Sequence, residues 1–214
     1  MNNQQPKLPG LYVIGDRKAA KAGDLVEVFA KAFAGGLRLA QLREKDLPDR
    51  ELLPLARAIV ECAAPYGAKL LVNRSFRVAL ESGAAGLHIG QKELSLIPAL
   101  RDQTPPEFLI GVSTHSLKEA LCAQKAGADF VTLGPAYATP SKAGMGEPLG
   151  PSAIAKAQEA LAIPVFALGG IDEGRLPDLR ALGIGRVALI RAVVAADDPQ
   201  EATTRLLAAL KNPP

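Results

Sequence analysis

Short apolar runs alternate with amphipathic stretches along almost the whole chain. The apolar runs are continuous, which is typical of parallel strands that are buried on both faces. The amphipathic stretches carry apolar residues at helical spacing, and glycine or proline often marks their ends. The pattern therefore predicts eight strand–helix pairs. The predicted strands are 11–16, 37–44, 69–73, 86–90, 108–115, 130–137, 164–171 and 186–194.

Eight such pairs in 214 residues predict an α/β protein that forms a single (β/α)8 TIM barrel. An open doubly wound sheet is the alternative, although such sheets usually have fewer strands. No linker-like stretch divides the chain, so we expect one domain over 1–214, with the barrel core at about 11–212. In this fold the active site lies at the C-terminal ends of the strands. The residues at which each apolar run ends are therefore the informative ones.

Composition narrows the class of partner. The net charge of +3 is too small to indicate binding to nucleic acid or to a membrane surface. The first residues are polar, unlike a signal peptide, and no apolar run reaches the ~18 residues of a membrane span. Cys62 and Cys122 lie in Ala-rich helical stretches, where we expect free thiols in a reducing compartment. We expect a cytoplasmic protein.

The predicted strand ends are rich in cations, with few acids nearby. Such a rim indicates a small phosphorylated substrate. Gly169 and Gly170 strengthen this interpretation, because glycines let backbone N–H groups approach an anion, and they follow the seventh strand, a usual phosphate site of this fold. The cations are Arg43, Lys45, Arg74, Lys142 and Arg191.

The two histidines both fall at predicted strand ends. His88 lies inside an apolar run, where a hydrogen-bonded core histidine and a functional one are equally good interpretations. His115 begins a helix after Ser113, and either neighbours the helix cap or carries a proton near neutral pH. We favour the proton carrier for His115. No cysteine–histidine spacing indicates a metal site.

The motifs QLREK, HIGQ, GVSTHS, GADFVTLGP, TPSK and ALGGI, in this order over about 11–195, resemble the thiamin phosphate synthase/TenI family. The resemblance implies an enzyme of thiamin biosynthesis with a (β/α)8 barrel, and it makes a homodimer possible. It also implies a catalytic role for His115 and for Lys142. The substrate-binding residues that it implies, together with the glycines and cations named above, are Gln41, Arg43, Lys45, Asn73, Ser113, Thr139, Ser141, Gly169, Gly170 and Ile190.

The chain departs from the synthase pattern at four positions. Arg74 replaces an aspartate that binds magnesium, and arginine has no lone pair to offer a metal. It would repel the metal or pair directly with phosphate, unless a register slip turns it toward solvent. Glu93 aligns with the second metal-binding aspartate and would hold Mg2+ if a metal is retained. Ser141 replaces threonine, and Arg191 replaces a small serine.

These departures favour the TenI branch. The leading hypothesis is a thiazole tautomerase that binds a thiazole phosphate, shifts a proton through His115 and requires no cofactor. The alternative is a thiamin phosphate synthase, which joins a pyrimidine pyrophosphate to a thiazole phosphate with Mg2+ and releases pyrophosphate. A third hypothesis is a regulator that binds thiazole or thiamin phosphate without catalysis.

Overall fold

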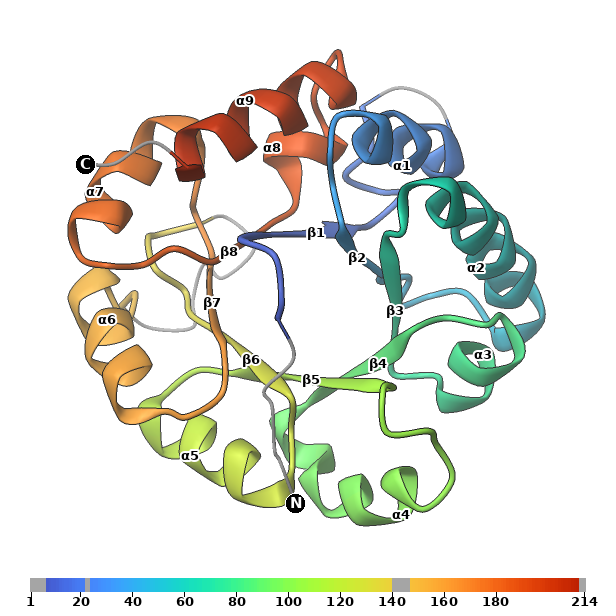
Figure 1. Cartoon of the computed structure of the whole chain (residues 1–214), viewed down its shortest axis with the longest axis horizontal. Coiled ribbons are helices and arrows are strands. Elements are labelled where there is room, and N and C mark those ends of the chain that lie inside the picture. The colour runs from blue at the N-terminus through green and yellow to red at the C-terminus, as the bar shows by residue number, and fades with distance from the viewer. Residues whose placement is uncertain (1–6, 22–23, 140–146, 212–214) are drawn as a thin grey trace.

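Eight parallel strands close into a barrel in which each strand pairs with its neighbours in the sequence and β8 pairs with β1 (Figure 1). The computed structural model describes residues 7–21, 24–139 and 147–211. The predicted (β/α)8 barrel is confirmed. The strands are β1 Leu11–Gly15, β2 Leu39–Leu42, β3 Lys69–Asn73, β4 Gly86–Gly90, β5 Leu109–Thr114, β6 Phe130–Leu133, β7 Val165–Leu168 and β8 Val187–Leu189.

Helices surround the strands on the outside (Figure 1). No helix among the described residues is long and apolar enough to cross a membrane. The α-helices are α1 Leu25–Ala34, α2 Asp49–Ala63, α3 Phe76–Glu81, α4 Ile97–Arg101, α5 Leu117–Ala126, α6 Pro151–Ala160, α7 Leu176–Ala181, α8 Arg191–Val194 and α9 Pro199–Lys211. Short 3₁₀ helices lie at η1 Ala64–Tyr66, η2 Gln91–Leu96 and η4 Glu173–Arg175.

The prediction of a strand over 186–194 is wrong in its second half. β8 ends at Leu189, and the β-branched residues that follow form α8 instead. Ile190 leaves the extended conformation at φ −116° and ψ −81°. Its carbonyl then accepts hydrogen bonds from the N–H groups of Val193 and Val194, at 3.3 and 2.9 Å. A helical turn can therefore begin directly at the C-terminal end of the barrel.

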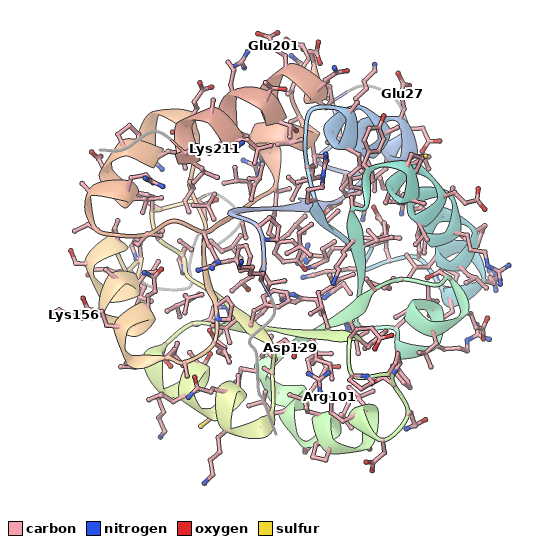
Figure 2. All side chains as sticks on the ribbon, in the orientation of Figure 1. Glu27, Arg101, Asp129, Lys156, Glu201 and Lys211 are labelled. Atoms are coloured by element: carbon pink, nitrogen blue, oxygen red, sulfur yellow. The ribbon has the colours of Figure 1, made fainter. Side chains whose placement is uncertain are left out.

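The side chains of the strands form two separate apolar layers. Residues on the outer face pack against the helices, and residues on the inner face fill the barrel, as the side chains in Figure 2 show. Inside, the rings of Tyr12, Phe130 and Phe166 lie 5.4 to 5.5 Å apart between centroids. Leu8, which precedes β1, joins this inner cluster and covers the N-terminal end of the barrel. Polar inner residues are consequently concentrated toward the other end.

An ion pair links helix α4 to the start of β6 at the N-terminal end of the barrel. Arg101 contacts Asp129 at 2.5 Å, and both residues are labelled in Figure 2. The same Asp129 oxygen accepts the backbone N–H of Ile110 at 2.6 Å. In this fold the active site lies at the C-terminal ends of the strands, so contacts at the N-terminal end support the stability of the barrel. The opposite end of the barrel, where the strands finish in polar residues, is the end that can hold the site.

Candidate active site

Four polar side chains from four strands form one hydrogen-bonded chain inside the barrel. The amide Nε2 of Gln41 donates to the Tyr12 hydroxyl at 2.7 Å. The same hydroxyl lies 3.1 Å from Nδ1 of His88, and Nε2 of His88 lies 2.9 Å from the Ser113 hydroxyl. Gly111 makes room for the imidazole, because a Cβ there would lie 2.7 Å from Nδ1 of His88. Two predicted substrate-binding residues, Gln41 and Ser113, are thus linked through the core.

Burial fixes the charge state of this chain. Burial, followed by the positive charge of Arg43, lowers the pKa of His88 to about 3. Burial also raises the pKa of the Tyr12 phenol far above its ordinary value, and the hydrogen bond from Gln41 opposes this only in part. His88 is therefore neutral at physiological pH and holds one ring proton. Of the two interpretations of His88, the structure supports a hydrogen-bonded interior histidine.

Asn73 and Arg74 sit where the sequence predicted, at the end of β3. The Asn73 amide donates to the backbone carbonyl of His88 at 2.9 Å, and the Arg74 backbone N–H donates to the same carbonyl at 3.0 Å. Arg74 has a left-handed backbone with φ 69°, which aspartate and asparagine adopt more readily than arginine. Its side chain is exposed and makes no hydrogen bond or ion pair with any described residue.

Glu93 is engaged in the local backbone. Its carboxylate accepts the N–H of Gly90 at 2.9 Å, which caps the 3₁₀ helix η2 that follows β4. Within 7–21, 24–139 and 147–211, no group of three histidine, cysteine, aspartate or glutamate residues is arranged to hold a metal. With Arg74 in the other predicted metal position, the described side chains do not fit a carboxylate site for Mg2+.

The prediction of few acids at the rim is wrong for the ends of β1 and β2. Glu44, which is 7% exposed, accepts the backbone N–H of Arg17 at 2.6 Å and its Nε at 3.0 Å. Arg17 also pairs with Asp46 at 2.8 Å. Arg43 lies 3.6 Å from Asp16. Long-range pairing between the two loops compensates these charges, which a count along the sequence could not show.

Lys45, the other predicted cation of this rim, lies in the loop after β2. Its side chain is exposed, in contrast to the buried Gln41. The predicted alternation of 41, 43 and 45 toward the interior therefore holds for Gln41 on the strand itself. Beyond Leu42, where β2 ends, strand alternation no longer fixes the direction of a side chain.

The glycine corner after β7 is built against the loop after β6. Gly169 and Gly170 have φ of 103° and 65°, and a Cβ on them would lie 2.7 Å from Pro135 and 2.8 Å from Tyr137. Tyr137 donates its N–H to the Gly169 carbonyl at 3.0 Å. Among described residues, none accepts a hydrogen bond from the N–H of Gly169 or Gly170. Packing requires both glycines, and their donors remain available to an anion.

Arg175 holds this corner from the outside. Its guanidinium donates to the Gly170 carbonyl and lies 4.5 Å from the centre of the Tyr137 ring. Ile190 packs against the inner cluster at the adjacent end of β8. Arg191, the first residue of α8, is exposed and contacts no charged or hydrogen-bonding partner in the described part of the chain. Within the described part of the chain, the predicted phosphate corner therefore combines two backbone N–H groups that have no acceptor with an exposed cation, Arg191, at the start of α8.

His115 lies just beyond β5 with its side chain 42% exposed. Its backbone N–H donates to the Glu119 carboxylate at 2.7 Å, and its Nδ1 lies 3.4 Å from the same oxygen. Thr139 is half-buried in the loop after β6. Ser141 and Lys142, the other predicted residues of that loop, lie outside the described residues. The structure thus neither joins His115 to the buried chain nor tests Lys142.

Sequence reasoning missed three residues of this region. Tyr12 and Asp16 belong to the predicted first strand, where the period of two could have assigned Tyr12 to the interior, whereas Asp16 lies beyond the end of β1 and pairs with Arg43 at the rim. The Thr132 hydroxyl is buried on β6, beside Ser113 in the strand register, and has no hydrogen-bond partner in the described part of the protein. An unpaired buried hydroxyl is expensive, which marks this layer as one that a ligand can complete.

Comparison with known proteins identifies what the chain resembles. A family model described as thiamine monophosphate synthase matches residues 11–193. A protein of Geobacter sulfurreducens named "Putative thiamine-phosphate synthase" is 48% identical over 200 residues, covering 94% of this chain and 93% of that protein. The thiamine-phosphate synthase of Shouchella clausii is 38% identical over 201 residues, covering 94% and 96%.

Solved structures agree with this match. The thiamine phosphate pyrophosphorylase from Pyrococcus furiosus superposes with a TM-score of 0.83 at 31% identity, covering 94% of this chain and 95% of that chain. A 3-hexulose-6-phosphate synthase superposes with a TM-score of 0.69 at 18% identity, which shows a shared fold alone.

Proposed function

Because the chain belongs to the thiamin phosphate synthase/TenI family, we propose that it joins a pyrimidine pyrophosphate to a thiazole phosphate and releases pyrophosphate. One arrangement carries the proposal. The family resemblance assigns Gln41 and Ser113 to the pyrimidine and the pyrophosphate, and it matches Asn73 to the asparagine after the third strand. All three attach to His88, directly or through Tyr12. Three strands thereby present polar groups to one end of the barrel interior. The names of the relatives favour this reaction over the tautomerase hypothesis.

The reaction requires binding of two anionic groups, the pyrophosphate and the thiazole phosphate, and different residues are available for each. For pyrophosphate, Ser113 supplies a hydroxyl, while Arg43, Lys45 and Arg74 supply positive charge. For the thiazole phosphate, donors come from the N–H groups of Gly169 and Gly170, which have no acceptor among the described residues, as at other helix- or turn-based phosphate sites. Ile190 and Arg191 directly follow β8, the strand that pairs with β7.

The chemistry needs charge stabilisation as the bond to pyrophosphate breaks. Negative charge then develops on the departing oxygens, and preorganised cations and donors stabilise it. Guanidinium groups of Arg43 and Arg74, together with the Ser113 hydroxyl, are suited to this role because none of them must be protonated first. The thiazole nitrogen supplies the electron pair for the new bond to carbon.

Mg2+ assists this reaction in the family as the resemblance describes it. Here Arg74 replaces one metal ligand and the Glu93 carboxylate is held by the Gly90 N–H, so the described donors do not fit the ion. The charge stabilisation therefore falls to the chain's own cations. Lys142 remains the predicted further cation of the loop after β6.

The test is a synthase assay on the purified protein with both substrates, run in Mg2+ and again in EDTA. We expect thiamin phosphate to form, and we expect Arg74→Asp to depend more strongly on Mg2+ than the wild type, because the substitution restores a carboxylate. A matched control is Arg77→Asp, three residues further along in the helix α3 that follows. Binding of thiazole phosphate without any product would contradict the proposal.

A thiazole tautomerase is the second candidate, and Arg74 with Glu93 is the observation that favours it. A proton shift needs no metal, and His115 beside Glu119 can exchange a proton with a bound ligand. His115→Gln should then abolish isomerisation while thiazole phosphate still binds. Unchanged isomerisation in that variant would remove His115 from the mechanism.

A further inference from the structure

The hydrogen-bonded chain from Gln41 to Ser113 has a direction. Tyr12, Gln41 and His88 are 0%, 1% and 1% exposed, whereas Ser113 at the end of the chain is half-buried. Burying polar groups is costly unless each donor meets an acceptor. An ordered chain that begins in the closed core and ends at the barrel mouth is therefore a candidate for positioning whatever binds there.

Counting protons along the chain fixes its direction. The Tyr12 hydroxyl accepts from Gln41 Nε2, so its own proton points to Nδ1 of His88. A neutral imidazole that accepts at Nδ1 carries its single proton on Nε2. That proton is donated to the Ser113 oxygen at 2.9 Å. The Ser113 proton must then point to a different acceptor.

The described surroundings of Ser113 supply no such acceptor. Thr132 lies beside it in the strand register, but the Thr132 hydroxyl has no hydrogen-bond partner among the described residues. We propose that His88 is a positioning residue, which, with Tyr12 and Gln41, makes Ser113 a donor toward an anionic oxygen at the barrel mouth.

The identity of that oxygen, a phosphoryl oxygen of the pyrophosphate group, rests on the proposed function. The direction of the chain does not. If the Gln41 amide presented its oxygen to Tyr12, every bond would reverse, and Ser113 would donate to His88 and offer only lone pairs to the ligand. Lone pairs repel an anion, so the two directions predict opposite behaviour.

Nitrogen NMR of the imidazoles reads the direction without any assay of activity. The chain has two histidines, so His115→Gln assigns both signals. We expect His88 to be neutral with its proton on Nε2, and Tyr12→Phe to weaken that preference, because it removes the hydroxyl and keeps the ring. A His88 proton on Nδ1 in the wild type would overturn the proposal.

Calorimetric titration with inorganic pyrophosphate then tests the consequence. Ser113→Ala should weaken binding about tenfold, the usual loss of one hydrogen bond to a charged group. Tyr12→Phe should weaken binding by a smaller factor, and the double variant should be no weaker than Ser113→Ala alone, because Tyr12 acts only through Ser113. Phe166→Leu is the matched control, since Phe166 contacts the Tyr12 ring at 5.5 Å but lies outside the chain of bonds.

Independent, multiplying losses in the double variant, or a wild type that does not bind pyrophosphate, would overturn the role of Ser113 as a donor to an anion. A protein that shows the Nε2 proton and the coupled losses, but makes no thiamin phosphate, would retain this proposal and lose the proposed reaction. The two failures are therefore distinguishable.

Discussion

Two regions of the barrel rim carry basic side chains in different surroundings. The first region is the pair of loops after β1 and β2, and the second is formed by the ends of β3 and β8. In the first region Arg17 and Lys18 reach Glu44 and Asp46 across the two loops. In the second, Arg74 and Arg191 are exposed and have no charged partner in the described part of the chain.

The difference separates cations that are held in close ion pairs from cations that are available to a ligand. Arg43, at 3.6 Å from Asp16, lies between the two groups and keeps part of its charge for an anion. A cation already paired with a carboxylate gains little from a phosphate, because the anion must compete with the acid beside it. An unpaired cation keeps its full attraction for an anion, although solvent and salt screen it at long range. The positive charge that matters for the substrate is therefore smaller and more localised than the sequence indicated.

Removing the acid at the centre of the paired region should give the largest effect. Glu44 is buried and accepts two hydrogen bonds from Arg17. We expect Glu44→Ala to lower the free energy of unfolding by about 3 kcal/mol, the range for losing hydrogen bonds to a buried charge. Urea denaturation measures this. Asp46→Asn, at an exposed pair, is the control and should change stability much less.

The interior histidine should give the next largest effect, through pH. The described carboxylates of the paired region are all engaged with Arg17, Lys18 or Arg43. Burial lowers the pKa of His88 from 6.5 to about 3. Between these two pH values His88 is protonated in the unfolded chain and neutral in the folded protein. Stability is thus full above the unfolded pKa and falls as the pH falls through this window.

The expected slope is about 1.4 kcal/mol per pH unit between about pH 6 and pH 4, measured as the difference from His88→Gln. Urea denaturation at several pH values measures it, and taking the difference cancels the titration of the carboxylates. Parallel curves for the two proteins would show that His88 titrates normally and is not held neutral by burial.

The unpaired cations should give the smallest effect, and on binding rather than on stability. Arg74→Ala and Arg191→Ala should each weaken the binding of a phosphorylated ligand about tenfold, the scale of one charge-assisted contact. Titration with pyrophosphate measures the loss of affinity in Arg74→Ala, and titration with thiazole phosphate measures the loss in Arg191→Ala. Lys18→Ala removes a paired cation and should leave both affinities within twofold. A loss in this variant as large as in Arg74→Ala or Arg191→Ala would contradict the distinction between the two regions.

Much of the fold could be predicted because its signal is local. β3 and β4 begin and end at the predicted residues, since continuous apolar runs bounded by polar residues define them. The run 186–194 misled because Val193 and Val194 favour strands, while the turn at Ile190 that starts α8 depends on the barrel's end. Propensity is a weak prior where tertiary structure sets the backbone.

The site was predictable only where strand alternation applied. Gln41, Asn73 and Ser113 followed from the ends of apolar runs, and the structure joins them. The Tyr12–His88 contact could not follow, because it links residues 76 positions apart through the closure of the barrel. The pairing of Arg17 with Glu44 could not be predicted either, because it joins residues that are distant in the sequence. This pairing lowers the positive charge of the rim below the predicted one.

The anchoring of the loop after β6 has a consequence for protein engineering. The Pro135 carbonyl accepts the Leu149 N–H at 2.9 Å, and Ala136 donates to the Leu168 carbonyl at 2.8 Å, so backbone bonds fasten both roots of the loop to the barrel. Closing a loop with fixed roots costs only about 0.6 kcal/mol for each doubling of its length. A different chain length between these two roots should therefore cost the fold little, so variants with a changed substrate can be sought there while the predicted cation Lys142 is kept.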